Sequence, residues 1–378
     1  MPPRKSSSTA RRTQPTKLTL LHTLQPGAGT VFDLAWSPDG TRLALACNNG
    51  TVHVYETEKY KPAFPAVSHD AAVLTVAWSP DGQQFAVGDG EGNVLLRDAA
   101  WGSELRRLAA LADGVYKVAW SPVGRRPRFA AAGADGTVRL WDGKDWLRPR
   151  DLDGLEQEVY CLLWSPDGQK LYTFSLDGTV RSAGLDSHRL RIALHDEDDF
   201  PICAAWRPPR PKKPPLMALG YSDGTVRFWD GVSKERQVSK LPGYTDQVTG
   251  VTFSHDGSLF ASKSLCGTVR VSRCDSWELV QLLQEPGNTR FHYTTIAFHP
   301  RELVLATLGD KDKEIRIWEV SPTSAVAEAV REKPDRGEAD ILFLAANPPV
   351  LLAEEVQPEF EVPLWTDKYS NLFSILKK

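Results

Sequence analysis

VFDLAWSPDGTRLALACNNGTVHVYE, residues 31–56, is the first copy of a repeat that fills most of this 378-residue chain. An aromatic residue followed by a turn signal recurs along the sequence, and a signature of the type DGTVRLWD (135–142) follows each copy. The aromatic anchors, which are separated by 42, 42, 44, 42, 47 and 45 residues, are Trp36, Trp78, Trp120, Trp164, Trp206, Phe253 and Phe298. A constant period of this kind is typical of a chain built from stacked copies of one structural unit.

Alternation and turn residues place the strands within each copy. In the first copy, VFDLAWS and TRLALAC read as two strands joined by the turn PDG, and NNG supplies the positive φ angles of a tight hairpin before TVHVYE. A fourth, outer strand follows, for example ELRRLAAL (104–111) or RQVSKLPG (236–243). Four antiparallel strands in a period of 40–45 residues make one propeller blade, and blades must stack to bury their faces. We therefore predict an all-β fold, a seven-bladed β-propeller.

The two ends of the repeat array complement each other. The seventh copy ends on KEIRIWE (313–319) and meets Pro322 without an outer strand, whereas KLTLLHTL (17–24) precedes the first inner strand. Pairing these segments removes an exposed sheet edge, which is a liability for aggregation. We expect residues 17–24 to close the ring as the outer strand of blade seven.

Two segments lie outside the propeller, which we place at residues 17–320. Residues 1–16 are rich in Ser, Pro, Arg and Lys, and we expect a disordered basic tail. Residues 321–378 form a short mixed C-terminal extension, with a helix predicted in SPTSAVAEAVREKP (321–334) and a buried strand in ADILFLAANP (339–348). This extension either packs on the propeller or is the remnant of a second domain.

Composition favours a cytoplasmic protein. Hydrophobic residues make up 41% and charged residues 25%, as in average globular domains, and the net charge of -3 gives no general attraction to nucleic acid or anionic membrane. The five cysteines contain no C-x-x-C pair, so neither a zinc site nor a disulfide framework is indicated. The N-terminus lacks the apolar core of a secretory signal, and no apolar run has the length of a membrane span.

The copies DGTVRLWD (135–142) and DGTVRFWD (223–230) resemble the WD-repeat β-propeller family, and the resemblance covers residues 17–320. It implies a buried polar tetrad in each blade, made of a His before the first strand, an Asp in the hairpin turn, a Ser or Thr, and the Trp of the WD pair.

This chain departs from the tetrad that the resemblance implies. Only His69 fits the histidine position, and its blade has Arg97 in place of the Trp, whereas Trp141 and Trp229 have no matching His. No blade has a complete network, so we expect stability to come mainly from apolar packing between blades, at about 25 cal/mol per Å².

The inner strands place one residue per blade beside the channel, three positions before each anchor. These residues are Asp33, Thr75, Lys117, Cys161, Cys203, Gly250 and Thr295. The set contains neither paired carboxylates nor a His cluster, as acid–base or metal chemistry would require, and the chain has no phosphate-binding loop. We predict that the protein is not an enzyme, has no cofactor and no metal, and takes no small-molecule substrate. We interpret Cys161 and Cys203 as small packing residues.

The residues four positions before each anchor open the inner strands, on the face that carries the turns between second and third strands. In WD-repeat proteins the rim of this face, around the channel, is a common site for binding a partner. Aromatic residues suit the core of an interface. We predict a non-catalytic protein–protein interaction scaffold that binds partner segments around the channel mouth. Packing between blades is the alternative role for these residues. The predicted partner-binding residues are Phe32, Leu74, Tyr116, Tyr160 and Ile202.

Basic loops of blades three and five lie on the opposite face, while HDEDDF (195–200) places acidic residues on the partner face. The alternative function is therefore binding of nucleic acid or another polyanion. Solvated loops, with RPPRPKKPP (207–215) as a stiff polyproline insert, explain the same pattern. The candidate anion-binding residues are Arg125, Arg126, Arg128, Arg210, Lys212 and Lys213.

Overall fold

The computed structural model describes residues 16–322, except 28, 123–127, 144, 156, 185, 196–198, 212, 214, 231–236, 242–243, 286–295 and 310–312. These residues belong to one compact unit, Met1–Thr323. The predicted disordered tail lies outside the described residues up to residue 15, and the predicted C-terminal extension lies outside them from residue 323 onward.

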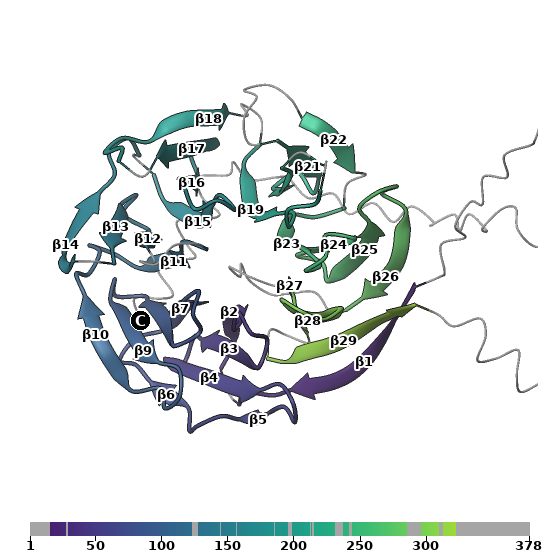
Figure 1. The fold of residues 1–378 in the computed structure, drawn as a ribbon, viewed down its shortest axis with the longest axis horizontal. Helices are drawn as coiled ribbons and strands as arrows, with labels where there is room; N and C mark the ends of the chain where they lie inside the picture. Colours follow the sequence, from purple (N-terminus) through teal and green to yellow (C-terminus); the bar gives the residue numbers. More distant parts are fainter. Residues whose placement is uncertain are drawn as a thin grey trace, which may run out of the picture. The chain divides into compact units, whose positions relative to one another are not determined.

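Throughout the described part of the chain the regular structure is β, and it forms seven antiparallel sheets around a ring (Figure 1). This arrangement confirms the predicted seven-bladed propeller. Blades 1 to 7 are numbered by their inner strands, which are β2 (Val31–Trp36), β7 (Val73–Trp78), β11 (Val115–Trp120), β15 (Val159–Trp164), β19 (Pro201–Trp206), β23 (Val248–Phe253) and β27 (Ile296–Phe298).

The second strands of the blades are β3 (Arg42–Cys47), β8 (Gln84–Asp89), β12 (Phe129–Gly133), β16 (Lys170–Ser175), β20 (Met217–Tyr221), β24 (Leu259–Ser264) and β28 (Val304–Leu308). The third strands are β4 (Thr51–Glu56), β9 (Val94–Asp98), β13 (Val138–Asp142), β17 (Thr179–Gly184), β21 (Val226–Trp229), β25 (Thr268–Arg273) and β29 (Ile315–Pro322).

Outer strands complete the blades, and β10 (Glu104–Leu108) ends before the predicted end at residue 111. In blade 1 the outer edge consists of two short strands that both pair with β4. The outer strands are β5 (Lys61–Pro62) and β6 (Val67–Ser68), β10 (Glu104–Leu108), β14 (Asp145–Asp151), β18 (Arg191–His195), β22 (Gln237–Leu241) and β26 (Leu279–Gln284).

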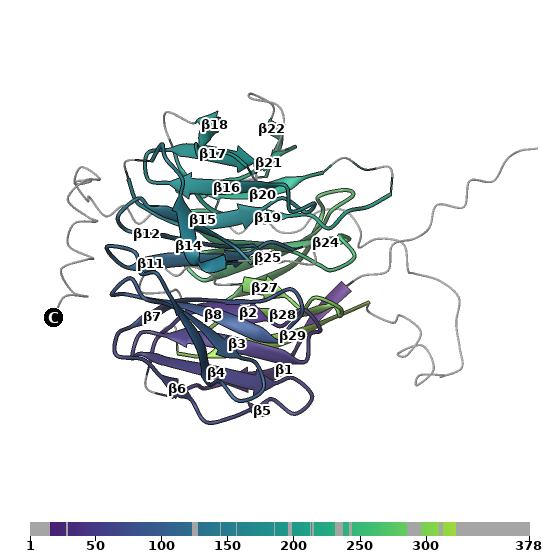
Figure 2. The same cartoon turned by 60° about the vertical axis from the view of Figure 1, so that its left-hand side comes forward.

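The outer strand of blade 7 is β1 (Thr16–Leu24), which confirms the predicted ring closure. It runs antiparallel to β29 from the pair Thr16↔Pro322 to the pair Leu24↔Ile315, with one irregularity between Leu20 and His22. Figures 1 and 2 both show the two strands side by side. Leu18 and Leu24 are buried, so the first strand also contributes to the core.

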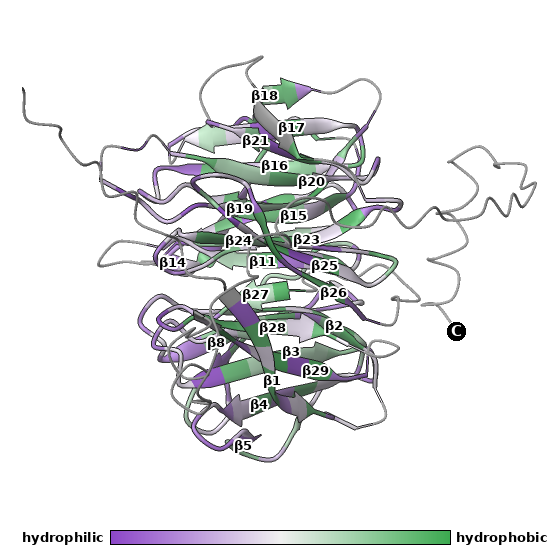
Figure 3. Cartoon of the chain, turned by 90° about the vertical axis from the view of Figure 1, so that its right-hand side faces the viewer, coloured by the Kyte–Doolittle hydropathy of each residue, from purple (hydrophilic) through white to green (hydrophobic). Residues whose placement is uncertain are grey.

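Apolar side chains from neighbouring blades form shared cores. One cluster joins Leu24 and Ile317 of blade 7 to Val31 and Leu45 of blade 1, and similar clusters lie between other neighbouring blades. Figure 3 shows hydrophobic residues along many strands of the stacked blades. Burial between blades is therefore the main apolar contribution to folding, as expected.

The tryptophan anchors also make a polar contact between blades. In three of them the indole N–H group donates to the backbone carbonyl of the residue that precedes the anchor of the preceding blade, whereas the indole N–H groups of Trp120 and Trp206 have no hydrogen-bond partner among the described residues. The observed bonds are Trp36 Nε1 to Ala297 O at 3.2 Å, Trp78 Nε1 to Ala35 O at 3.0 Å, and Trp164 Nε1 to Ala119 O at 3.3 Å. At these three anchors the indole thus combines apolar packing with a polar contact to the neighbouring blade, which a Phe ring could not provide.

The Ser-Pro-Asp-Gly sequences are turns, as predicted. Ser37 Oγ donates to Asp39 Oδ1 at 2.6 Å, and the backbone N–H of Arg42 donates to Ser37 Oγ at 2.9 Å. Gly40 closes the turn at φ 76°, a left-handed conformation that favours glycine. The same Ser–Asp bond recurs at 2.5–2.6 Å in blades 2, 4 and 6.

Blade 7 contains a modified version of the family tetrad that the sequence did not reveal. Trp318 Nε1 donates to Thr307 Oγ1 at 2.9 Å, and Thr307 Oγ1 donates to Glu285 Oε1 at 2.8 Å. The backbone N–H of Glu285 donates to Gly267 O at 3.0 Å, just as His69 N donates to Gly50 O in blade 2, so Glu285 stands in the histidine position. The fully buried Lys263, with Nζ 3.2 Å from Glu285 Oε2, compensates the carboxylate charge.

Other blades replace different members of the tetrad. In blade 2, burial and the charge of Arg97 lower the pKa of His69 to about 4, so the neutral ring accepts a hydrogen bond from Arg97 Nε at 3.2 Å. In blade 6, Tyr244 takes the histidine position, and its hydroxyl lies 2.9 Å from Ser262 O.

Blades 3 and 4 each keep one half of the Thr–Trp pair. Among the residues that the structure describes, Trp141 Nε1 has no hydrogen-bond partner, because Ala131 stands where blade 7 has Thr307. Within the same residues, the Thr173 hydroxyl has none either, because Ala183 replaces the tryptophan.

Substitution by Val should change the free energy of unfolding differently at the two buried threonines. Thr307→Val removes the partner of both Trp318 and Glu285, and we expect a loss of about 1–3 kcal/mol in the free energy of unfolding. Thr173→Val removes a buried hydroxyl that has no partner among the described residues, so stability should stay the same or rise by up to about 1 kcal/mol. Urea unfolding of both variants checks this, and equal losses would contradict the assigned network.

Candidate functional site

The channel-side residues of blades 1 to 3 form one buried network around Asp33. Its Oδ2 lies 3.0 Å from Lys117 Nζ and accepts hydrogen bonds from Thr75 Oγ1 at 2.8 Å and Val76 N at 3.1 Å. Its Oδ1 accepts from the backbone N–H of Leu34 at 3.0 Å. The carboxylate is fully buried and has partners from three consecutive blades. It therefore holds these blades together and is poorly placed to take a proton from a substrate.

The two channel-side cysteines are buried, and their thiols are poorly reactive. Burial raises the pKa of Cys161 to about 11 and that of Cys203 well above its ordinary value. Both thiols stay protonated at neutral pH, and Cys203 Sγ lies 3.4 Å from Val248 O. This supports their interpretation as packing residues. Gly250 is also buried, and Thr295 lies outside the described residues.

The predicted partner-binding residues are less exposed than an interface requires. Phe32, Leu74, Tyr116 and Ile202 are 2 to 9% exposed, whereas Tyr160 is half-buried. The strand irregularity at Phe32 interrupts the alternation of β2, because Val31 and Leu34 belong to one core cluster and Phe32 is not among its members. For these four residues, the burial favours the alternative of packing between blades. Their binding of a partner stays a prediction.

Each predicted partner-binding residue lies at an irregularity of its strand. The register between the first and second strands of blades 1 to 5 shifts between the residues on either side of it, as between Val31 and Asp33 around Phe32. A β-bulge redirects its extra side chain and increases the local twist. The repeated bulge therefore sets the direction of one residue per blade at the mouth of the channel.

Tyr160 has a mixed aromatic and acidic surrounding at this mouth. Its ring centroid lies 6.3 Å from that of Phe200, which is also half-buried. Burial and the nearby charge of Asp113 raise the pKa of Glu158, two residues before Tyr160. Blades 3 to 5 thus gather an aromatic pair and two carboxylates on the face of the turns between second and third strands.

The DGTVR signature forms a closed polar cluster on the same face. In blade 5, Arg227 NH2 donates to Asp223 Oδ2 at 2.9 Å, and Arg227 Nε donates to Thr225 Oγ1 at 3.1 Å. Arg181 makes the corresponding pair of bonds in blade 4. The i, i+2, i+4 spacing, which places these side chains on one strand face, is the signal in the sequence that could have revealed the cluster.

The candidate anion-binding residues lie in varied surroundings. Arg210 NH1 is 3.0 Å from Asp275 Oδ1, Arg128 is half-buried and Lys213 is exposed. Arg125, Arg126 and Lys212 lie outside the described residues. The structure therefore shows one of the six candidates neutralised by an acidic neighbour, and the polyanion role stays a prediction.

Within the described ranges, no group of three His, Cys, Asp or Glu side chains lies close enough together to hold a metal ion. A separate search of the same ranges finds no helix with the length and apolarity of a membrane-spanning segment.

Comparison with known proteins places this chain beside WD-repeat proteins. The family model for the WD domain, G-beta repeat, matches residues 64–98, 102–142, 149–182 and 235–271. The model for the anaphase-promoting complex subunit 4 WD40 domain matches residues 19–65. Together the two models match segments from β1 to blade 6, with residues 183–234 between the matched segments.

Curated relatives match parts of the chain. WD repeat-containing protein 90 of Mus musculus is 30% identical over 152 residues, which is 38% of this chain and 8% of that protein. The Homo sapiens protein of the same name is 37% identical over 26% of this chain and 6% of its own length. WD repeat-containing protein VIP3 of Arabidopsis thaliana is 25% identical over 39% of this chain and 44% of its own length. The chain thus spans less than half the length of each of these relatives.

The pair formed by Asp33 and Lys117 should show strong energetic coupling. Lys117→Met leaves the buried carboxylate without its charged partner, and we expect a loss of about 3–5 kcal/mol in the free energy of unfolding. The double variant Asp33→Asn/Lys117→Met should be more stable than Lys117→Met alone, because the uncompensated charge is gone. A double-mutant cycle by urea unfolding measures the coupling, and additive losses would contradict the proposed role of the network.

Proposed function

Because the chain belongs to the WD-repeat family of β-propellers, we propose that it is a non-catalytic scaffold that binds segments of partner proteins at the channel mouth. The binding face is the one with the turns between second and third strands. The observation that carries this proposal is the half-buried pair of Tyr160 and Phe200, whose ring centroids lie 6.3 Å apart. Tyr and Phe rings provide a large contact area with few rotatable bonds, which suits a binding surface.

The proposed site has a rigid base. Phe32, Leu74, Tyr116 and Ile202 are buried at the bulges of the inner strands, so their role in this proposal is to support the rim. Tyr160 is then the member of the predicted set that contacts the partner directly. A preformed surface of this kind limits the entropy that is lost on binding.

The channel chemistry supports a scaffold over an enzyme. Asp33 is saturated by Lys117 and by backbone and hydroxyl donors, and the thiols of Cys161 and Cys203 are held in the protonated form. The Asp33 carboxylate is therefore engaged by protein donors, and the two protonated thiols are poor nucleophiles at neutral pH.

The proposal also includes protein partners and a location in the cytoplasm. One matching family model is named for a subunit of a complex, in keeping with a role in assembly. The relatives share only part of their length with this chain, so their names do not identify its partner. We place the protein in the cytoplasm. Nucleic acid is the less favoured ligand, since Arg210 already has an acidic partner in Asp275.

Two tyrosine variants separate binding from packing. Tyr160→Ala should keep the melting temperature within a few degrees and weaken capture of the principal partner, by about 2 kcal/mol for a central interface aromatic. Tyr116→Ala should lower the melting temperature, because its ring is only 4% exposed. Quantitative pull-down at two salt concentrations, with thermal unfolding of each variant, provides the readouts.

Partner capture unchanged in Tyr160→Ala would contradict the proposed site. Capture that falls steeply with salt and depends on Lys213 instead would favour the polyanion function, through counterion release.

A further inference from the structure

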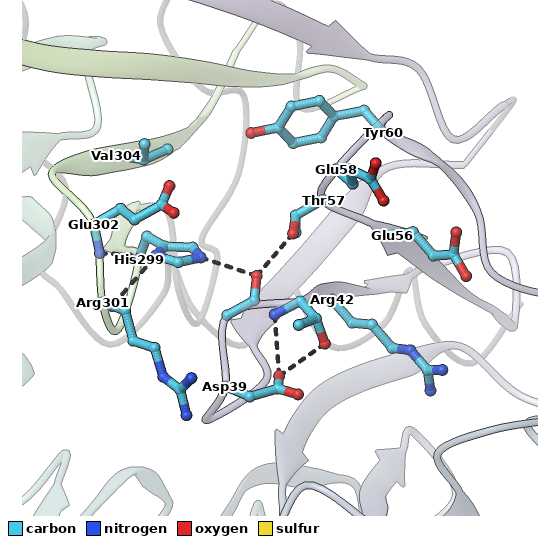
Figure 4. A pocket seen from close by; sticks show the side chains of 12 residues that line it. Asp39, Arg42, Glu56, Thr57, Glu58, Tyr60, His299, Arg301, Glu302 and Val304 are labelled. Atoms are coloured by element: carbon cyan, nitrogen blue, oxygen red, sulfur yellow. Dashed lines mark hydrogen bonds between the residues drawn. The ribbon is translucent and has the colours of Figure 1, made fainter.

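A polar cavity of about 610 Å³ lies between blades 7 and 1, on the face opposite the proposed partner site. Its walls come from the first turn of blade 1 (39–42), from the connection that leads to the outer strand of blade 1 (56–60), and from the first turn of blade 7 (299–304). Figure 4 shows these side chains around a common space. Its size is within the range of sites for small ligands or for protruding side chains.

The base of the cavity is fixed by hydrogen bonds to one carbonyl group. His299 Nε2 lies 2.9 Å from Gly40 O, and Thr57 Oγ1 donates to the same oxygen at 2.8 Å. His299 Nδ1 accepts from the backbone N–H of Glu302 at 3.0 Å, so the ring is neutral and carries its proton on Nε2. A side chain at Gly40 would come within 2.2 Å of His299. This part of the cavity is therefore preformed, and its polar groups are already occupied.

The cavity walls carry carboxylates that have no hydrogen-bond or ion-pair partner among the described residues. Glu56, Glu58 and Glu302 are exposed, and their carboxylates make no hydrogen bond or ion pair within the part of the chain that the structure describes. Arg42, in contrast, donates to the carbonyl of Ala99 in blade 2. Figure 4 shows the guanidinium groups of Arg42 and Arg301 extending away from Tyr60. The lining as a whole has four carboxylates (Asp39, Glu56, Glu58 and Glu302) against two guanidinium groups (Arg42 and Arg301), an excess of negative charge.

Tyr60 is the aromatic residue that lines the cavity beside these carboxylates. Its ring stacks on His22 of the closing strand, with centroids 4.9 Å apart and planes at 16°, and its backbone has φ 50°. Burial and the charge of Glu302 raise the pKa of Tyr60, so the hydroxyl keeps its proton. That hydroxyl has no hydrogen-bond partner among the described residues, and Figure 4 shows it on the same side of the cavity as Glu302.

The chemistry of the lining favours an extended organic cation over a metal ion. No three acidic, His or Cys side chains of the described ranges converge closely enough to ligate one ion. A guanidinium group is planar and has five N–H donors, so it can contact carboxylates on two walls at once, and it also stacks on aromatic rings. An ammonium group is compact and strongly hydrated, and it matches this arrangement less well.

We propose that this cavity binds an arginine side chain of a partner protein, held between Glu58 and Glu302 beside Tyr60. The site goes beyond the proposed function, because it lies on the other face of the propeller and recognises a different chemistry. The two walls come from the first and last blades, so the site exists only in the closed ring.

Fluorescence anisotropy with a labelled peptide Gly-Ser-Arg-Gly-Ser tests the proposal at physiological salt. Its citrulline counterpart keeps the shape of the side chain and removes the charge. We expect saturable binding of the arginine peptide and a dissociation constant at least about ten-fold weaker for the citrulline peptide. The double variant Glu58→Gln/Glu302→Gln should weaken binding to the same extent. Because both residues are exposed, its melting temperature should match the wild type.

Two control variants keep the test specific. Glu278→Gln changes an exposed carboxylate in the corresponding connection of blade 6 and should bind like the wild type. Tyr160→Ala should also bind the arginine peptide normally, so failure at one face is distinguishable from failure at the other. Absence of saturable binding, equal binding of the citrulline peptide, or unchanged binding by the double Gln variant would overturn the proposal.

Discussion

The antiparallel pairing of β1 with β29 is the constraint on which the rest of the structure depends. Seven blades of this repeat leave one blade short of an outer strand, and the first strand of the chain supplies it. Leu24 of β1 then packs with Ile315 and Ile317 of blade 7 and with Val31 of blade 1 in one core. The pairing therefore removes an open edge and joins the two ends of the ring at once.

Polar contacts between neighbouring blades also hold the ring together. The indole N–H groups of Trp36, Trp78 and Trp164 donate to the preceding blade, and Asp33 connects blade 1 to blades 2 and 3. Blade 7, next to the closure, has the Thr307–Trp318 pair and the buried Glu285 and Lys263. Blades 3 and 4 have lost one member each. Polar satisfaction is thus uneven, and apolar packing compensates where it is missing.

Closure of the ring also brings together the residues of one proposed binding site. The cavity beside Tyr60 is bounded by residues near the start and near the end of the array, such as Gly40 and His299, which only the closed ring brings together. The face around Tyr160 depends instead on bulges in successive inner strands. The two sites therefore offer different chemistry, an aromatic pair at one and a cavity with several carboxylates at the other, from a single repeated unit.

The period and the strand count were enough to predict the seven blades and the closing strand, because both follow from local patterns that recur seven times. The bulges at Tyr116 and Tyr160 were not predictable, since a bulge is defined by the partner strand, so residues expected on the surface are buried or half-buried.

Other features of the site depend on contacts between distant parts of the sequence. Asp33 and Lys117 are 84 residues apart, and their pairing follows from the stacking of blades. Glu285 was missed for another reason: its residue type differs from the histidine of the family, and only its backbone bond to Gly267 O reveals the shared position. The cavity beside Tyr60 has no local signature in the sequence at all.

Native-state hydrogen exchange of two chains, one beginning at residue 16 and one at residue 25, tests the ring closure most directly. Amides of β29 that pair with β1 should be protected in the longer chain and exchange rapidly in the shorter one, with weaker protection spreading to the core shared by blades 7 and 1. Equal protection of β29 in both chains would contradict the closure of the ring by the first strand.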